Sequence, residues 1–124
     1  MKQKLTEKLF KDYPEIFKQK DLNLTQTCMC WGIETGNGWY NLIDNLCAMI
    51  MEYCKLNNYP IPEASQVKEK YGTLRFYMDN SNNDIENLIN IATHTSAITC
   101  EICGKIGELN NGPWYLVKCD SCRK

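Results

Sequence analysis

Two CxxC pairs near the C-terminal end of the chain constrain its fold more than any other feature. Cys100 and Cys103 form the first pair, Cys119 and Cys122 form the second, and fifteen residues separate them. A two-residue gap lets both sulfurs of a pair reach one tetrahedral ion, and two such pairs usually share a metal. A redox-active CxxC is the alternative, which the presence of a second pair disfavours. The spacing predicts one structural Zn²⁺ bound by all four cysteines.

The sequence between the two pairs is typical of a zinc ribbon. Gly104 and Gly107 permit a sharp bend after the first pair, and Asn110 to Gly112 form a turn before a strand at 114–117. Residues 99–124 carry four basic and three acidic side chains, so a zinc ion with four thiolates leaves about one net negative charge. This balance favours a structural ribbon over one that binds nucleic acid, which stays as the alternative.

The length of 124 residues allows one core and is too short for two full domains. We therefore expect an α+β core over residues 1–98 and a zinc ribbon over residues 99–124 that shares this core. The net charge of −1 supplies no global attraction to nucleic acid or to a membrane surface. No apolar run is long enough to span a bilayer, and the N-terminal residues do not resemble a secretory signal. These features predict a cytoplasmic protein, in which eight cysteines serve metal binding rather than disulfides.

Apolar periodicity predicts helices on both sides of a loop. Residues 4–13 predict a helix, because Leu5, Leu9, Phe10 and Tyr13 lie on one helical face. Pro14 suits the first turn of a second short helix that runs through Phe17. Residues 18–27 are polar and aperiodic, which predicts a loop. The clearest helix begins near Asn37 as N-cap and ends at Asn57 and Asn58.

The segment 64–79 predicts a β-hairpin that is followed by a helix at 83–97. Glycine at the first central position permits a type II′ turn, so we place Gly72 and Thr73 in the turn. Glu86 is expected to close a capping box at the start of the helix. The turn implies a register that pairs Tyr71 with Leu74, Val67 with Met78, Glu69 with Phe76, Lys70 with Arg75 and Lys68 with Tyr77. The fold class is therefore α+β, a small helical core packed on a hairpin, with a C-terminal four-cysteine zinc ribbon.

One face of this hairpin is basic. Lys70 opposite Arg75 is an unfavourable cross-strand pair unless something negative lies beside it. A solvated hairpin whose charges discourage edge pairing is the alternative explanation. The residues predicted to bind an anionic, nucleotide-like ligand or an acidic protein surface are Lys68, Lys70, Arg75 and Tyr77, with an indole from Trp31 or Trp39.

A glycine-rich stretch lies between Trp31 and Trp39. It matches neither a P-loop nor a dinucleotide fingerprint, so backbone amides at the start of the following helix are the only anion site it offers. A tight turn anchored by two core indoles is the alternative. A second metal site at Cys28, Cys30, Cys47 and Cys54 is disfavoured, because seven helical residues span about 10 Å. His94, the single histidine, is expected to be structural or exposed rather than catalytic.

Three sequence features together resemble a family of small phage and prophage proteins. They are Trp31-Gly32 with Gly38-Trp39-Tyr40, the run QVKEKYGTLRFY at 66–77, and the terminal four-cysteine ribbon. The resemblance covers the chain from about Tyr13 to its C-terminal end. It implies a viral or mobile-element setting, in which small accessory proteins often bind and disable a host defence component.

These features predict a non-enzymatic binding protein, with a nucleic-acid-binding zinc-ribbon protein as the alternative. The hairpin face would capture an anionic, nucleotide-like ligand or block a host defence protein. One histidine and no assembled acid-base motif argue against catalysis. An enzyme would have to use carboxylates such as Glu34, Asp44 or Glu69.

Overall fold

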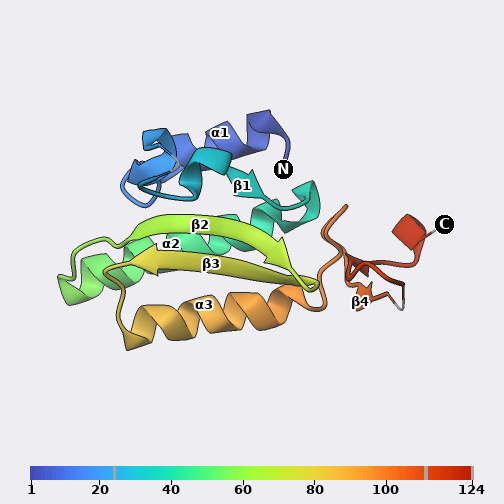
Figure 1. Cartoon of the computed structure of the whole chain (residues 1–124). Helices are drawn as coiled ribbons and strands as arrows, with labels where there is room; N and C mark the ends of the chain where they lie inside the picture. The colour runs from blue at the N-terminus through green and yellow to red at the C-terminus, as the bar shows by residue number, and fades with distance from the viewer. Residues whose placement is uncertain (24, 111, 124) are drawn as a thin grey trace.

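The computed structural model describes residues 1–23, 25–110 and 112–123 and has an α+β fold, as the sequence predicted (Figure 1). The helices are α1 (Gln3–Asp12), α2 (Tyr40–Asn57) and α3 (Asn83–Ser96). The strands are β1 (Ile33–Glu34), β2 (Glu63–Lys70), β3 (Thr73–Asp79), β4 (Glu108–Leu109) and β5 (Val117–Lys118). Short 3₁₀ helices are η1 (Lys18–Asp21), η2 (Met29–Trp31), η3 (Asn37–Trp39) and η4 (Ser121–Arg123). No helix of the described ranges is both long and apolar enough to cross a membrane.

The core sheet has the strand order β1-β2-β3, with β1 parallel and β3 antiparallel to β2. Helix α2 passes behind this sheet and α3 runs along the side of β3 (Figure 1). Val67, Leu74 and Phe76 are buried on the covered face, because alternate residues of a strand point to the same side. The backbone amide of Leu74 donates to Ser96 Oγ of α3 at 2.8 Å, so α3 provides a hydrogen-bond acceptor for a backbone N–H of β3, the edge strand beside it.

The hairpin register differs from the predicted one by one position at the turn. Tyr71 and Gly72, rather than Gly72 and Thr73, are the central turn residues, and both have positive φ, at 54° and 84°. Two positive φ values define a type I′ turn, whose twist matches that of the flanking strands. The predicted pairing of Lys70 with Arg75 is therefore wrong. The observed pairs are Lys70 with Thr73, Glu69 with Leu74, Lys68 with Arg75, Val67 with Phe76 and Gln66 with Tyr77, and a bulge follows Ala64.

The segment after α1 does not form the predicted second α-helix. A turn in which the Phe17 amide donates to the Tyr13 carbonyl at 3.2 Å leads into η1. Ile16 and Phe17 are fully buried, and the Ile16 carbonyl accepts from the Ala64 amide at 2.8 Å. This bond to β2 fixes the segment as a connection on the core, where a longer helix would move both side chains out of place.

The central helix occupies the predicted region but is capped differently. Its first turn is the 3₁₀ helix η3, and Asn37 Oδ1 accepts from the Lys2 backbone amide at 2.7 Å instead of capping α2. Asn58 ends α2 in the left-handed conformation with φ 50°, as its position predicted. In α3, the cap is Asn82, whose side chain accepts from the Ile85 amide at 2.9 Å, and Glu86 binds Ser81 rather than closing a capping box.

Candidate metal centre and neighbouring surfaces

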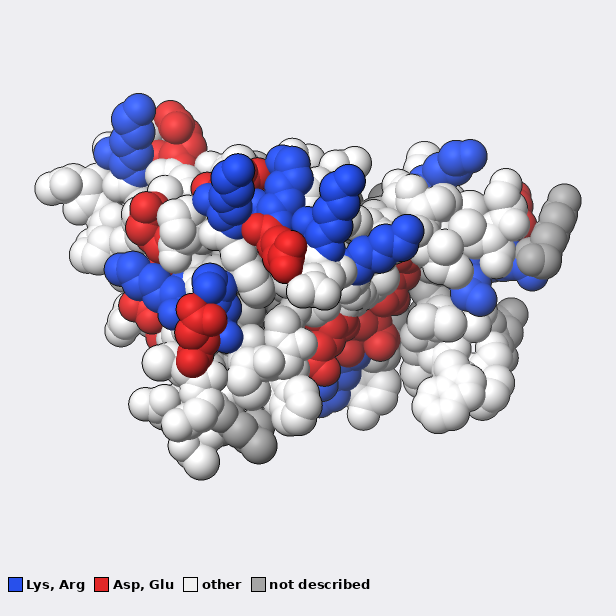
Figure 2. All heavy atoms as spheres, turned by 90° about the horizontal axis from the view of Figure 1, so that it is seen from above, with Lys and Arg blue, Asp and Glu red and all other residues white. Residues whose placement is uncertain are grey.

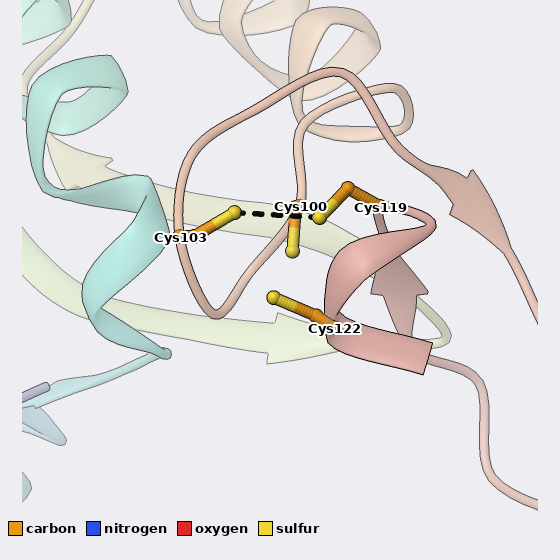
Figure 3. Close-up of side chains that lie close together, drawn as sticks. All are labelled: Cys100, Cys103, Cys119 and Cys122. Carbon is orange, nitrogen blue, oxygen red and sulfur yellow. Dashed lines mark hydrogen bonds between the residues drawn. The ribbon is translucent and has the colours of Figure 1, made fainter. Parts of the chain in front are cut away.

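Four cysteines from two loops of the C-terminal ribbon converge on one point (Figure 3). Cys100 and Cys103 lie in the bend after α3, Cys119 follows β5, and Cys122 lies in η4. Their sulfur atoms all lie within 4.8 Å of one another, and Sγ of Cys103 is 3.5 Å from Sγ of Cys119. Four thiolates around one ion at about 2.3 Å would lie about 3.8 Å apart. The spacing therefore fits a single tetrahedral metal ion.

Each CxxC pair lies in a tight turn, and both of its sulfur atoms point toward the centre of the cluster (Figure 3). The Gly104 amide donates to the Cys100 carbonyl at 2.9 Å, and the Cys122 amide donates to the Cys119 carbonyl at 3.1 Å. Strands β4 and β5 pair antiparallel between the two turns and hold them together. The two loops and this short ribbon position the four sulfurs as a zinc ribbon would.

The pKa values of the four cysteine thiols shift in different directions within the cluster. Burial raises the pKa of the Cys100 thiol, but backbone hydrogen bonds from Cys119 and Cys103 outweigh it and lower the pKa to about 6. The pKa of Cys119 is also lowered, chiefly by a backbone hydrogen bond from Cys122. Cys122 has its pKa raised to about 12 by its hydrogen bond to the Cys119 sulfur. Without a cation the cluster thus retains protons, and a divalent ion would allow all four cysteines to bind as thiolates.

Four protein ligands complete a tetrahedral shell, which leaves no open position for a substrate or a water molecule. A metal ion here would therefore be structural. All eight cysteines are free thiols. Among the described residues, the four C-terminal cysteines are the one group of three or more His, Cys, Asp or Glu ligands that converges. Cys47 and Cys54 are buried in α2, whereas Cys28 and Cys30 are exposed in the loop before β1.

The glycine-rich stretch before α2 packs directly against the first cysteine turn, which contains Cys100 and Cys103. The Gly38 amide donates to the Glu101 carbonyl at 2.8 Å, and the Gly36 amide donates to Glu101 Oε2 at 2.8 Å. A Cβ at Gly38 would overlap the Cys100 carbonyl oxygen and lie 2.6 Å from the Gly104 nitrogen. The amides considered as an anion site are thus occupied by the protein's own Glu101.

The two tryptophans that flank this stretch have opposite environments. Trp39 is fully buried, and its indole N–H donates to the Thr99 carbonyl at 2.9 Å. Its proposed role beside a ligand is therefore corrected, because the ring has no exposed face. Trp31 is 62% exposed, so the expectation of two core indoles holds for Trp39 alone.

The basic hairpin face, Lys68, Lys70, Arg75 and Tyr77, lies on one side of the sheet despite the changed register. Moving the turn by one position exchanges partners but keeps the alternation of each strand. Lys68 now pairs with Arg75, and Glu34 of β1 lies next to Lys68 on its other side. Arg75 Nε is buried and has no hydrogen-bond partner within the described parts of the chain. Tyr77 is 45% exposed.

The carboxylates considered for catalysis do not form a common site in the structure. Asp44 Oδ1 accepts from the Tyr13 hydroxyl at 2.6 Å, and Glu69 Oε2 accepts from the Gly72 amide at 2.7 Å. Glu34 is exposed beside Lys68, and His94 is exposed near the end of α3. Each of these side chains has its own surroundings, and no two of them are joined by a hydrogen bond within the ranges described.

Sequence reasoning missed one surface, formed where the hairpin turn meets the ribbon. Tyr71, Trp114 and Tyr115 are all exposed there and line the same groove as Glu69. The sequence offered one signal of this surface, since Pro113 directly before Trp114 and Tyr115 is typical of a loop. The pair was assigned to a strand, whereas β5 begins only at Val117.

Comparison of the chain with protein-family models, with curated proteins and with solved structures found no match.

Proposed function

We propose that this protein is a non-enzymatic binding protein whose ribbon holds one structural zinc ion and whose basic hairpin face docks on an acidic protein surface. Zinc is the expected metal because four thiolates in a tetrahedral set suit it. The ion would hold the two loops of the ribbon together, and binding would take place on the sheet. In the phage setting that the sequence resemblance implies, the partner would be a host defence component.

The observation that carries this proposal is the direct pairing of Lys68 with Arg75. Like charges directly opposite each other on a sheet destabilise it unless an anion lies nearby. Within the described residues, neither side chain forms a salt bridge, although Glu34 is a strand neighbour of Lys68. An acidic partner would remove the repulsion between Lys68 and Arg75 and gain charge-assisted hydrogen bonds.

The shape of the face favours a protein over a small molecule. Small ligands usually occupy concave sites, and three pockets of ≈ 400, ≈ 450 and ≈ 490 Å³ in the described part of the chain lie at the ribbon junction and between α2 and the segment at 59–61. Tyr77 offers a partly exposed ring on the basic face, which is the observation that favours a nucleotide-like ligand as the second candidate. Nucleic acid is less favoured, because acidic and basic side chains intermingle over the surface seen in Figure 2.

Native mass spectrometry of the protein purified from host cells tests this function. Wild type is compared with the triple variant Lys68→Ala, Lys70→Ala, Arg75→Ala. The matched control is Lys4→Ala, Lys11→Ala, Lys55→Ala, which removes three charges from exposed lysines of α1 and α2. We expect wild type and control to retain a stoichiometric protein partner that the hairpin variant loses.

Other outcomes of the same experiment separate the alternatives. A retained small molecule that is lost from the hairpin variant would support the nucleotide-like ligand instead. A partner that stays bound to the hairpin variant, or the absence of any bound species in wild type, would contradict a binding role for this face.

A further inference from the structure

A groove lies where the turn of the β2-β3 hairpin meets the ribbon. Its volume is ≈ 490 Å³, and its walls include Glu69 and Tyr71 from the hairpin and Trp114, Tyr115 and Leu116 from the ribbon. The hairpin turn packs closely on the ribbon, since a Cβ at Gly72 would lie 2.6 Å from Leu109 Cδ1. Two elements far apart in sequence thus form one concave site.

The walls of this groove are aromatic and exposed. Trp114 is 78% exposed and Tyr115 is 51% exposed, in contrast to the fully buried Trp39 and Phe17 of the core. The Tyr71 and Tyr115 rings stand nearly perpendicular, at 83°, with centroids 5.9 Å apart. Exposed aromatic side chains gathered in one concavity usually mark an interaction site.

The groove also carries negative charge. The Glu69 carboxylate is held in place by the Gly72 amide at 2.7 Å. Leu116 lines both this groove and a second pocket of ≈ 400 Å³, which Glu101 also lines. Glu101 is more than nine-tenths buried, and its Oε1 has no hydrogen-bond partner among the described residues. Acidic side chains gather at this junction between core and ribbon, beside an uncharged surface of the ribbon (Figure 2).

The combination of aromatic faces and a fixed carboxylate selects the charge of the occupant. A purely apolar occupant would cover the Glu69 carboxylate without pairing it, which is costly. A stacked base would bring its phosphate toward the same carboxylate. A cation satisfies both parts of the wall, because ring faces and carboxylates each attract positive charge. Lys70 already shows this attraction, since its ammonium nitrogen lies 5.5 Å from the Tyr71 ring centroid.

We propose that the hairpin–ribbon groove binds an arginine side chain of a partner protein, with the guanidinium stacked on Trp114 and paired with Glu69. Arginine fits better than lysine because its planar guanidinium stacks on rings and can pair with both oxygens of a carboxylate. This site adjoins the basic hairpin face where Lys70 lies against the Tyr71 ring, and it has the opposite charge preference. Its test uses a cationic peptide and variants outside the basic face, so either proposal can fail without the other.

The test uses the metal-loaded full chain and two short probes, acetyl-Gly-Arg-Gly-amide and the same peptide with citrulline. Citrulline keeps the shape of arginine but is neutral. Aromatic proton resonances in NMR titrations report which rings each peptide contacts. We expect the arginine peptide to shift Tyr71, Trp114 and Tyr115 with saturable binding, and the citrulline peptide to shift them at least severalfold more weakly.

Variants of the groove identify the groups that bind. We expect Trp114→Ala and Glu69→Gln each to weaken binding of the arginine peptide roughly two- to fivefold. Leu56→Ala removes an exposed apolar side chain of α2 outside the groove and is the control, which should bind as wild type does. Trp114→Ala alters only an exposed ring, so it keeps the test valid if Glu69→Gln disturbs the turn.

Three results would overturn the proposal. The first is equal binding of the arginine and citrulline peptides, and the second is unchanged binding in Trp114→Ala. The third is the absence of any shift of the groove resonances by the arginine peptide at tens of millimolar, a range that covers a weak single side chain.

Discussion

Single residues explain the glycine-rich stretch before α2 better than any nucleotide motif does. Gly36 and Gly38 let the backbone approach the first cysteine turn, and Glu101 closes the contact with its side chain and its carbonyl. Trp39 adds an indole hydrogen bond to Thr99. The stretch is therefore a docking surface for the metal-binding turn, and its small residues are required by close packing.

Replacing Gly38 with alanine tests this reading at the residue scale. The new methyl group would overlap the Cys100 carbonyl oxygen, so we expect the free energy of unfolding to fall by about 1–3 kcal/mol. Chemical denaturation of the metal-loaded protein measures the change. The matched control is Gly112→Ala, whose methyl group would meet, among the described residues, only Asn110 Nδ2 at 3.6 Å and should change stability by less than about 0.5 kcal/mol. Equal stability of the two variants would show that Gly38 is not a packing contact.

The sequence also shows where residue-level prediction ends. Trp31 and Trp39 flank the same loop and carry the same side chain, but one is exposed and the other is buried. The buried Trp39 indole donates to the Thr99 carbonyl, which lies sixty residues further along the chain. Periodicity within a short window carries no information about such a contact.

Among the elements, local patterns predicted the three α-helices, but they also predicted one at residues 14–17 that does not form and misplaced the hairpin turn. The periodic faces of α2 and α3 and the end of α2 at Asn58 depend on neighbouring residues, so they could be predicted. The turn at Tyr71-Gly72 also depends on the ribbon, against which Tyr71 and Gly72 pack. A positive φ, here 54°, is uncommon for tyrosine, so the local sequence does not predict this conformation of Tyr71. The packing of Tyr71 against the ribbon, which accompanies it, is seen only in the tertiary structure.

Removal of the metal tests the ribbon as an element. Because the binding free energy of a structural metal ion is folding free energy for the segment that holds it, we expect a chelator to raise amide hydrogen exchange over residues 99–123. Amide exchange should also rise over residues 36–39, because the Gly36 and Gly38 amides donate to Glu101 and the Trp39 indole donates to Thr99. Helix α2 and strands β2 and β3 should keep more of their protection.

A cysteine control accompanies this experiment. Cys119→Ser should reproduce the effect of the chelator, whereas Cys28→Ser, an exposed cysteine outside the cluster, should exchange as wild type does. Unchanged protection of the ribbon after chelation would mean that the ribbon folds without a metal ion.

The whole molecule has three distinct parts. The core supplies a sheet with a basic face, the four-cysteine cluster joins two loops of the ribbon, and the ribbon with the hairpin turn forms an acidic, aromatic groove. The cysteine cluster could be predicted because ligand spacing is encoded in adjacent residues. The groove could not, because its walls come from residues 69–71 and 113–116, which only the tertiary fold brings together.

The central claim is that one metal ion joins the two CxxC pairs, and the metal content of the purified protein tests it most directly. Native mass spectrometry with elemental analysis should find one zinc ion per chain in wild type and in Cys28→Ser. Cys100→Ser, Cys103→Ser, Cys119→Ser and Cys122→Ser should each lose it or bind it far more weakly. Protein that is fully folded without a metal ion, or zinc that stays bound in all four variants, would contradict the claim.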